Sequence, residues 1–334
     1  MIIGAGPAGT TCACLLKRAG VDCVLVDFAS FPREKICGGG LTPRAWHLLE
    51  ELLPDLKYDY LPVRKCRLIV DGKARVEIEP TEEQRNVSRK DFDNALLQYY
   101  LNLGGEFVQD AFSAFQDTTG DDKMLVSLKS GEQICCRYLV GADGANSRVR
   151  RQLLGKYRGN VLFLEQKVKK RDNVLDGEIS SRYNHGYYYR FPHMDYDVVG
   201  YGEKHASAQK FRDLLKGLGI PETKIQGAYI PVEVVESGRD NIMLIGDAGG
   251  FANSLTYEGL YYALVTGRNA SIAIRQGIPF REANRDIFRR KRREKWMANF
   301  FYTPLGRWIT KACCHNKDLV RKLFDKGVAA KQNG

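Results

Sequence analysis

The sequence has no long apolar run and no recognisable targeting segment. No stretch of about 18 apolar residues occurs, so we expect no transmembrane helix. The chain opens on a glycine-rich motif rather than on a basic segment followed by an apolar one, so no secretory signal peptide is expected. Internal repeats and low-complexity linkers are also absent. These absences favour a globular protein of the cytoplasm.

Metal-binding cysteine spacings are also missing. The chain has nine cysteines but no pair of Cys-x-x-Cys motifs. An odd number of cysteines without a secretory signal favours reduced thiols. Cys12 and Cys14 fall within an expected helix, and the neighbours Cys135 and Cys136 point to opposite faces of an expected strand. We therefore expect no metal site.

Basic residues exceed acidic ones by 51 to 40, which gives a net charge of +11. Part of the excess lies in the cluster 289–293, Arg-Arg-Lys-Arg-Arg, but no nucleic-acid-binding module is recognisable and we expect no nucleic-acid partner. The cluster has three remaining explanations: a solvated helix face, attraction to an anionic membrane, or attraction to a phosphorylated substrate. Trp296 and Trp308 near these charges suit peripheral membrane docking, and a packed helical cap explains them equally well. The sequence gives no indication of an oligomeric state.

The order of the expected elements indicates an α/β protein. With 334 residues, the chain has room for about two domains of roughly 150 residues each. Residues 1–3 resemble the end of a buried strand but fall short of the roughly five residues typical of strands, so either the strand is clipped or the chain start is truncated. Hydrophobic periodicity and turn residues predict the other elements. We expect strands at 23–27, 63–78, 138–143, 241–245 and throughout 160–235, and helices at 10–19, 43–53, 89–103, 258–276 and beyond.

A glycine-rich turn between the first strand and the first helix has the spacing of a dinucleotide-binding fingerprint. In the segment Gly-Ala-Gly-Pro-Ala-Gly, the first glycine permits a tight turn, the second lets the backbone approach a pyrophosphate, and the third allows close packing of helix on strand. The N-terminus of the helix offers N–H groups and partial positive charge to phosphate. An acidic residue at the end of the second strand can accept hydrogen bonds from ribose hydroxyls. The cofactor-binding residues predicted by this motif are Gly4, Gly6, Pro7, Ala8, Gly9 and Asp27.

Two further motifs favour FAD over NAD. The strand expected at 241–245, which is apolar from Ile242 onward, ends at Gly246 and Asp247 in a loop, and a helix follows at Gly259 and Leu260. The Asp247 carboxylate can bind ribityl hydroxyls, and the helix N-terminus can stabilise negative charge on a reduced flavin. In the third motif, Asp143 and the glycine after it end another strand just before a helix.

The three motifs, in this order and spacing, resemble the p-hydroxybenzoate-hydroxylase-type flavoprotein superfamily over residues 1–275. The resemblance implies that the chain binds FAD non-covalently and that Asp143 also lies at the cofactor. It further implies an α/β fold in which an FAD-binding Rossmann-like domain is interleaved with a β-sheet-rich substrate domain and followed by C-terminal helices. The expected boundaries are 1–62 with 86–155 and 238–277 for the FAD-binding domain, 63–85 with 156–237 for the substrate domain, and 278–334 for the basic C-terminal helical region.

Within that superfamily, the loop at residues 31–41 resembles the geranylgeranyl reductase family, in which a Lys-x-Cys-Gly-Gly-Gly segment lies against the FAD. Arg89 matches the family's FAD-binding arginine, and Gly259 and Leu260 match its flavin-contacting helix start. Cys37 is the candidate catalytic residue, because a thiol beside a flavin can donate a proton, although it can also gate the cavity or simply pack. The cofactor contacts implied by the loop and the arginine are Arg33, Cys37, Gly38, Gly40 and Arg89.

Residues 187–192, Tyr-Tyr-Tyr-Arg-Phe-Pro, are similar to the substrate-cavity motif of the same family, with Tyr189 in the place of a tryptophan. A tyrosine-rich strand can also serve sheet packing alone. Another aromatic residue, Tyr257, precedes the flavin-facing helix. The substrate contacts implied by the resemblance are Tyr187, Tyr189, Phe191, Pro192 and Tyr257.

The resemblance implies an FAD-dependent reductase of carbon–carbon double bonds. NADPH, NADH or a reduced protein would reduce the flavin, and the flavin would pass a hydride to an alkene of an isoprenoid or similar apolar substrate, such as a prenyl lipid. Two alternatives remain open. One is an FAD monooxygenase, either a hydroxylase or a halogenase-like enzyme, although the Trp-x-Trp-x-Ile-Pro segment of halogenases is absent. The other is a non-enzymatic electron-transfer or redox-sensing flavoprotein.

Overall fold

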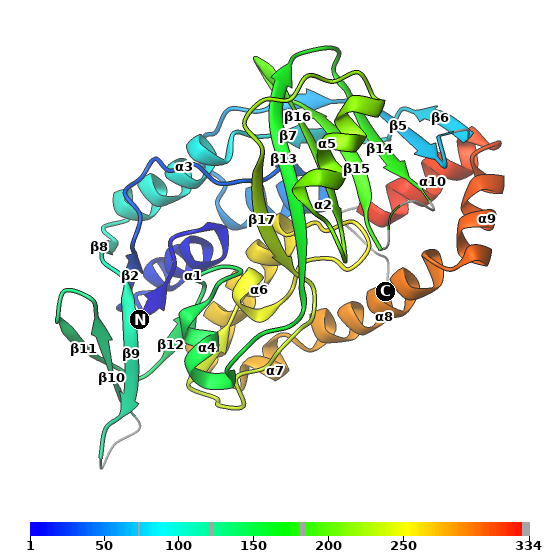
Figure 1. Ribbon diagram of the computed structural model, residues 1–334. Coiled ribbons are helices and arrows are strands. Elements are labelled where there is room, and N and C mark those ends of the chain that lie inside the picture. Colours follow the sequence, from blue (N-terminus) through cyan, green and yellow to red (C-terminus); the bar gives the residue numbers. More distant parts are fainter. Residues whose placement is uncertain (73, 120–122, 181–182, 184, 329–334) are drawn as a thin grey trace.

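The computed structural model describes residues 1–72, 74–119, 123–180, 183 and 185–328. The chain forms a mixed α/β fold with two main sheets, two smaller sheets and a group of C-terminal helices (Figure 1). The fold class expected from the sequence is confirmed.

The first main sheet has five parallel strands in the order β18-β12-β1-β2-β8. Parallel strands are buried on both faces and therefore need near-continuous apolar runs, which the segments 24–26 and 242–244 supply. The shortest strand, β1, lies in the middle of the sheet, where it pairs with both β12 and β2. The bounds are β1 Ile2–Ile3, β2 Val24–Asp27, β8 Glu106–Gln109, β12 Leu139–Gly141 and β18 Ile242–Leu244.

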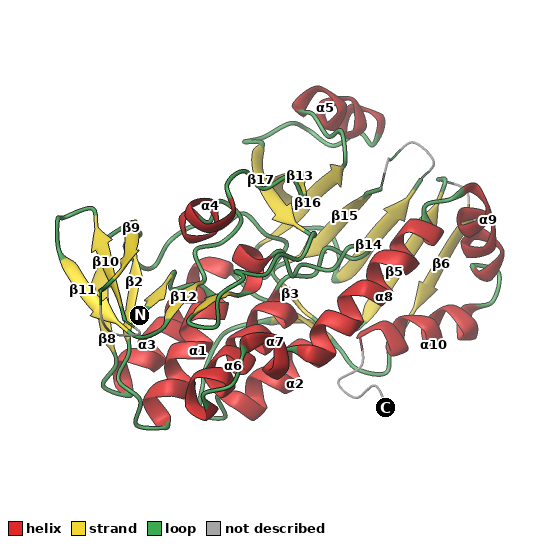
Figure 2. Cartoon of the chain, turned by 90° about the horizontal axis from the view of Figure 1, so that it is seen from below, coloured by secondary structure: helices red, strands yellow, loops and turns green. Residues whose placement is uncertain are grey.

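Helices cover one face of this sheet, and a three-stranded antiparallel sheet covers the other (Figure 2). Alternating side chains divide between the two faces: Ile2 and Leu25 pack with the helices, whereas Ile3 and Val26 pack with the antiparallel strands. The helices are α1 Pro7–Arg18, α2 Pro43–Leu52, α3 Arg89–Asn102 and α6 Leu260–Gln276. The opposite face carries β9 Phe112–Asp117, β10 Met124–Leu128, β11 Gln133–Cys136 and α4 Arg148–Leu154.

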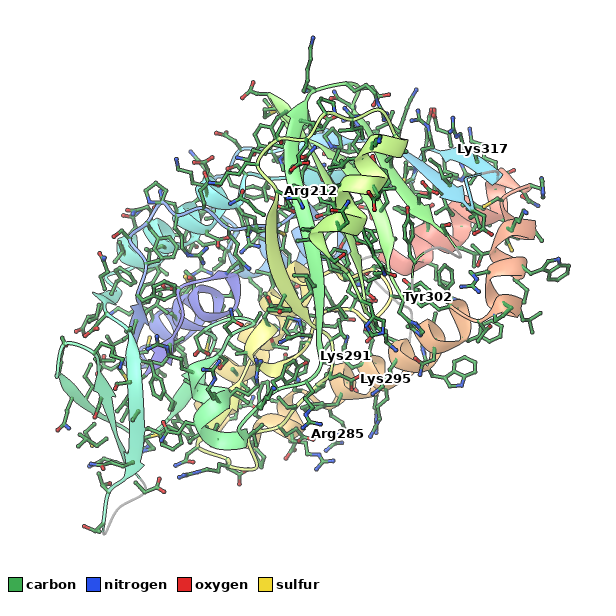
Figure 3. The ribbon with its side chains drawn as sticks, viewed as in Figure 1. Arg212, Arg285, Lys291, Lys295, Tyr302 and Lys317 are labelled. Atoms are coloured by element: carbon green, nitrogen blue, oxygen red, sulfur yellow. The ribbon has the colours of Figure 1, made fainter. Side chains whose placement is uncertain are left out.

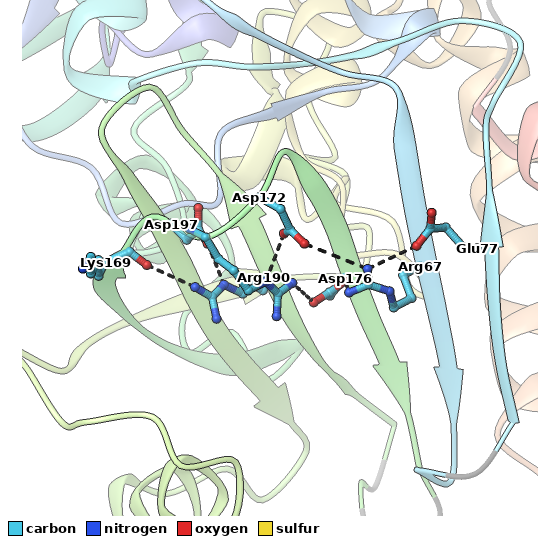
Figure 4. Close-up of polar contacts among 8 residues, drawn as sticks. Arg67, Glu77, Lys169, Asp172, Asp176, Arg190 and Asp197 are labelled. Atoms are coloured by element: carbon cyan, nitrogen blue, oxygen red, sulfur yellow. Dashed lines mark hydrogen bonds and ion pairs between the residues drawn. The ribbon is translucent and has the colours of Figure 1, made fainter.

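The second main sheet has seven strands in the order β17-β13-β16-β15-β14-β5-β6, in which only the pair β14 and β5 is parallel. Ion pairs across neighbouring strands support it (Figure 4). Arg67 Nη1 lies 3.0 Å from Asp176 Oδ1, and Arg190 Nε lies 2.6 Å from Asp197 Oδ2. The bounds are β5 Lys65–Val70, β6 Ala74–Ile78, β13 Asn160–Lys169, β14 Val174–Ile179, β15 Tyr187–Pro192, β16 Tyr196–Glu203 and β17 Gln226–Pro231.

One helix lies where only strands and loops are expected. Residues Ala208–Gly217 form α5, which packs on the second main sheet. Phe211 and Leu215 are four residues apart, so both point from one face of the helix into the core. Ser207 caps the helix by accepting a hydrogen bond from the Lys210 backbone N–H. The expectation of strands and loops throughout 160–235 is therefore wrong for this segment.

A small sheet and the C-terminal helices join the two main sheets. The small sheet has the order β3-β7-β4, from β3 Gly40–Leu41, β7 Gln84–Asn86 and β4 Leu61–Val63. Helix α10 packs beside β6, where the Asp325 carboxylate accepts hydrogen bonds from the Thr81 backbone N–H and hydroxyl at 3.1 and 2.7 Å. The C-terminal helices are α7 Phe280–Ala283, α8 Arg285–Phe301, α9 Pro304–Cys313 and α10 Lys317–Val328.

Three further expectations concern the whole chain. The five-stranded sheet draws strands from residues 2–3, 24–27, 106–109, 139–141 and 242–244, with the strands of the seven-stranded sheet lying between them; the exact domain boundaries stay a proposal. All nine cysteines are described and are free thiols, and no metal-binding cluster occurs among the described residues. In that same part of the chain, no helix combines the length and the apolar character needed to cross a bilayer.

Candidate cofactor and substrate site

The glycine-rich turn between β1 and α1 has the tight geometry that the sequence predicts. A Cβ atom on Gly9 would lie 1.9 Å from the Gly4 carbonyl oxygen, so only glycine fits. The carboxylate of Asp27 holds the turn by accepting hydrogen bonds from the backbone N–H groups of Ala5, at 2.7 Å, and Ala29, at 2.9 Å. Each oxygen of Asp27 keeps a second acceptor position, which a ribose hydroxyl can use.

The N-terminus of α1 is suited to an anion. The helix begins at Pro7, three residues earlier than expected, because proline is favoured in the first helical turn. The N-cap residue, Gly6, has no side chain to occupy the free N–H groups. Arg33 lies over this turn, with its Nη2 atom 3.7 Å from where a Cβ on Gly6 would be. Helix N–H groups and a guanidinium together match a pyrophosphate.

A second arginine is tied to the first through a buried carboxylate. Arg89 donates two hydrogen bonds to Asp93, from Nε at 2.8 Å and Nη2 at 2.9 Å, and Arg33 Nη2 lies 3.1 Å from the same carboxylate. Asp93 is fully buried. Burial opposes the charge on Arg89, but Asp93 and the Cys37 sulfur raise the pKa of Arg89. Two guanidinium groups on one carboxylate leave net positive charge beside the α1 N-terminus.

Asp247 lies at the junction of α1 and α6. Gly246 packs closely on Ala8 of α1, and the Gly246 N–H donates to the Thr266 hydroxyl at 2.9 Å. Within the described residues no hydrogen-bond donor reaches the Asp247 carboxylate, although burial raises its pKa against the opposing charges of nearby basic residues. The first turn of α6, which begins after Gly259, has no side-chain cap. A half-buried acceptor beside an uncapped helix N-terminus fits the hydroxyl groups and the electron-poor ring of a flavin.

Asp143 has a structural partner of its own. Its Oδ2 atom accepts hydrogen bonds from the backbone N–H groups of Arg148, at 2.6 Å, and Val149, at 3.3 Å, so it caps α4. Its Oδ1 atom is buried without a partner among the described residues. The neighbouring Arg150 donates from Nη1 to the carbonyl oxygens of Asp247, at 3.1 Å, and Ala248, at 2.8 Å, and thereby joins this segment to the Asp247 loop.

The Cys37–Gly40 loop lies on the second main sheet. A Cβ atom on Gly38 would approach the Phe191 ring to 2.8 Å, so this glycine permits close contact of the loop with strand β15. The Cys37 backbone N–H donates to Glu165 Oε1 at 2.9 Å, and the Gly38 carbonyl lies 3.1 Å from His193 Nε2. These contacts fix the loop on the second main sheet.

Strand β15 presents an aromatic face toward that loop. Tyr187, Tyr189 and Phe191 alternate onto one side of the strand, with ring centroids 5.9 and 5.0 Å apart. Tyr257 joins them, 5.8 Å from Tyr187. The structure adds Phe163 of β13, whose ring lies 4.6 Å from Tyr257. We call these five residues the aromatic wall.

Pro192 does not belong to the aromatic wall. In the regular register of β15 with β16, its side chain falls on the opposite side of the strand from Phe191. Its carbonyl accepts a hydrogen bond from Asn86 Nδ2 at 2.7 Å, which ties β15 to the small sheet. Alternation along the strand could have separated Pro192 from the three aromatic residues before the structure was known.

Glu165 connects the loop, the aromatic wall and a pocket. Its Oε2 atom accepts a hydrogen bond from the Tyr189 hydroxyl at 2.8 Å, while Oε1 holds the Cys37 backbone. Burial raises the pKa of Glu165, against the lowering effect of both donors. The pocket beside it is lined by Lys35, Cys37, Arg89, Glu165, Lys167 and His193, among others.

Several of these residues lie outside the sequence predictions. The sequence did contain a signal for the ion pair of Asp93, because Asp93 follows Arg89 by four residues on an expected helix. No local sequence pattern pointed to Glu165 or Phe163, since the residues they contact are distant in the sequence. The structure otherwise gathers the predicted residues of the three motifs around the α1 N-terminus. The free helix N-termini, the two arginines and the unpartnered Asp247 fit a non-covalently bound FAD.

Comparisons with known proteins cover most of the chain. Residues 1–168 match the family model described as FAD binding domain. An uncharacterized protein of Methanosarcina barkeri is 30% identical, over 91% of this chain and 84% of the relative. A geranylgeranyl diphosphate reductase of Rhodobacter capsulatus is 29% identical, over 97% of this chain and 90% of the relative. A menaquinone reductase of Mycolicibacterium smegmatis is 30% identical, over 83% of this chain and 76% of the relative.

Solved structures share the fold. A geranylgeranyl bacteriochlorophyll reductase-like protein from Thermoplasma acidophilum superposes with a TM-score of 0.75 at 20% identity, over 98% of this chain and 90% of that one. The halogenase PltM superposes with a TM-score of 0.74 at 16% identity, over 98% and 85%. Since a reductase-like protein and a halogenase share this fold, the fold alone does not select the reaction.

Proposed function

Because the chain belongs to the geranylgeranyl reductase family of FAD-dependent oxidoreductases, we propose that it reduces carbon–carbon double bonds of an isoprenoid or similar apolar substrate. The observation that carries this proposal is the contact between the Cys37–Gly40 loop and the aromatic wall. An apolar chain against the wall would lie next to the residues proposed to hold the flavin.

Different residues of the proposed cofactor site would bind different parts of the FAD molecule. The turn at residues 4–9 and the two arginines would hold the pyrophosphate, Asp27 would bind the ribose, and Asp247 would bind the ribityl hydroxyls. The N-terminus of α6 would face the flavin ring and stabilise negative charge there. When bound and reduced, FAD would supply the hydride. An external donor, either NADPH, NADH or a reduced protein, would supply the electrons.

The aromatic wall would bind the substrate through burial of apolar surface. The wall contains no charged residue. The Tyr187 hydroxyl donates a hydrogen bond to the Thr256 carbonyl at 2.7 Å, and the Tyr257 hydroxyl donates one to the His185 carbonyl at 2.6 Å. A hydrocarbon chain therefore meets no unsatisfied polar group at these positions. Relatives named geranylgeranyl diphosphate reductase support a prenyl substrate.

The proton that completes the reduction has two candidate sources in this chain. One is the Cys37 thiol at the loop. The other is the Tyr189 hydroxyl, which would give its proton to the substrate and recover one from protonated Glu165, its hydrogen-bond partner beside the pocket. Burial favours the protonated form of Glu165, which suits a group that stores a proton.

Anaerobic turnover tests the proposed reaction. The holoprotein is reduced chemically without oxygen and mixed with a panel of polyprenyl compounds, and reoxidation of the flavin and the saturated product are measured. We expect both with at least one compound. Cys37→Ser and Glu165→Gln should retain FAD, and the variant that removes the proton source should slow product formation. Cys135→Ser, at an exposed thiol on β11, is the matched control.

Two outcomes would contradict the proposal. Substrate-stimulated oxygen consumption with a hydroxylated or halogenated product would identify a monooxygenase or halogenase-like enzyme instead. Reversible reduction of the flavin with no turnover of any apolar alkene would favour electron transfer or redox sensing.

A further inference from the structure

The exposed apolar side chains of this protein concentrate at one place. Of the thirteen large hydrophobic side chains that are exposed among the described residues, eight lie between Trp296 and Leu323, on α8, α9 and α10. Trp296 and Trp308 are 69% and 67% exposed. Isolated exposed apolar residues are ordinary on a protein surface, but a cluster of this kind marks an interaction site.

Six of these side chains form what we call the α8–α9 surface. The end of α8 and the start of α9 meet closely, because a Cβ on Gly306 would lie 2.3 Å from the Phe300 carbonyl oxygen. The rings of Trp296 and Phe300 stack, with centroids 6.2 Å apart. Figure 1 shows α8 and α9 along an outer edge of the molecule. The surface consists of Trp296, Met297, Phe300, Leu305, Trp308 and Ile309.

Cations continue this surface along the same side of α8. Arg289 and Arg293 precede Trp296 by seven and three residues, so the helix aligns them with it. Arg292 and Arg293 are exposed, and no ion pair involves either guanidinium within the described part of the chain. The helix thus has a basic first half and an aromatic second half on its outer side.

The opposite side of α8 holds the helix firmly to the body of the protein. Figure 3 labels two lysines of this helix, Lys291 and Lys295. Lys291 is buried and donates a hydrogen bond to the Ala252 carbonyl, and Lys295 Nζ lies 2.6 Å from Glu233 Oε2. Ile287 and Ala298 are buried on the same side. The exposed aromatic residues are therefore presented by an anchored helix rather than by a frayed end.

We propose that the α8–α9 surface docks this protein on a lipid bilayer that carries anionic headgroups. Tryptophan and arginine around an apolar strip are the composition of helices that lie in the membrane interface. Charge complementarity selects this occupant over a second copy of the chain, because the exposed Arg292 and Arg293 match anionic headgroups, whereas a second copy brings the same basic surface and the same net charge of +11.

Docking would also orient the substrate side. Tyr302 ends α8 beside the α8–α9 surface, and its ring centroid lies 4.8 Å from that of His185. The His185 carbonyl in turn accepts a hydrogen bond from the Tyr257 hydroxyl at 2.6 Å, so His185 connects Tyr302 to the aromatic wall. If the proposed function holds, an apolar substrate dissolved in the bilayer would reach the wall from this side; the docking itself does not depend on that reaction.

Vesicle sedimentation tests the docking. The FAD-loaded full chain is mixed with vesicles of phosphatidylcholine alone or of phosphatidylcholine with phosphatidylglycerol, without substrate. We expect binding to the anionic vesicles, weaker binding at high salt, and a blue shift of tryptophan fluorescence. Since each basic residue near an anionic surface strengthens binding about fivefold, Arg292→Gln with Arg293→Gln should weaken it about 25-fold. Trp296→Ser with Trp308→Ser should weaken it at least tenfold.

The controls separate docking from misfolding and from self-association. All the substituted side chains are exposed, so FAD content should not change. Lys216→Gln with Leu218→Ser, which alters one exposed cation and one exposed apolar residue near α5, should bind as the unchanged protein does. Failure of the holoprotein to bind anionic vesicles, or binding that survives both pairs of changes, overturns the proposal. So does a dimer, seen by analytical ultracentrifugation, that the tryptophan pair disrupts.

Discussion

Replacing Asp93 by asparagine tests how the two arginines of the cofactor site are held. The carboxylate of Asp93 is fully buried and receives two hydrogen bonds from Arg89 and the charge of Arg33. Asparagine keeps the shape and one acceptor oxygen but removes the negative charge. The variant therefore leaves two guanidinium groups around a neutral amide.

The substitution should destabilise the protein without FAD more than the protein with FAD bound. Breaking a buried ion pair costs about 3–5 kcal/mol, and the partial exposure of Arg33 places the loss for the protein without FAD near the lower limit, about 3 kcal/mol. With FAD bound, the pyrophosphate would face the same guanidiniums, and we expect a loss of about 1 kcal/mol. The difference of about 2 kcal/mol corresponds to roughly thirtyfold tighter FAD binding by the folded variant.

Urea unfolding is monitored by circular dichroism with and without saturating FAD, which measures the loss of unfolding free energy in each state. Quenching of flavin fluorescence measures the affinity of the variant for FAD directly. Asp91→Asn is the matched control, since Asp91 is an exposed carboxylate in the first turn of the same helix. Equal losses in the two states would refute the reasoning and make Asp93 a purely structural residue. Weaker FAD binding by the variant would refute it as well.

Three other substitutions have defined outcomes. Asp247→Ala should lower FAD affinity about tenfold or more, because it removes an acceptor for ribityl hydroxyls; undiminished occupancy in the purified variant would exclude this residue from the site. Gly38→Ala should destabilise the protein by about 1–3 kcal/mol, since its Cβ would meet the Phe191 ring at 2.8 Å; an unchanged urea midpoint would show that the loop yields. Burial lowers the pKa of His193 from 6.5 to about 4, so its neutral form contributes stability that is present above pH 6.5 and lost as pH falls toward 4. His193→Asn should abolish this pH-dependent part of the unfolding free energy, which is on the order of 3 kcal/mol. If both proteins lost the same stability on acidification, the loss could not be assigned to His193.

The sequence predicted the features whose signals are local. The turn at residues 4–9, the strand before Gly246 and the helix that begins at Arg89 each combine a glycine, a cap or an apolar period within a few residues, and the structure forms them with small shifts at the ends. The extra turn of α1 at Pro7 is such a shift.

The features that escaped prediction depend on contacts between distant segments. Cys37 meets Glu165 across 128 residues, and nothing near either residue encodes that pairing. Phe163 looks like any apolar residue of a sheet strand until β13 is placed beside β16. Helix α5 was missed because the surrounding strands suggested continuity, although the spacing of Phe211 and Leu215 was visible in the sequence.

The five-stranded parallel sheet also has a consequence for synthesis of the protein. Its central strand β1 pairs with β12, about 140 residues later, and β12 pairs with β18, a further hundred residues on. Contacts so distant in the chain are slow to form, and the sheet cannot close on the ribosome until Leu244 has emerged. The α6 helix, which completes the cofactor site, follows later still. FAD should therefore be captured only after most of the chain has been made, and added FAD should accelerate the final step of refolding rather than the first.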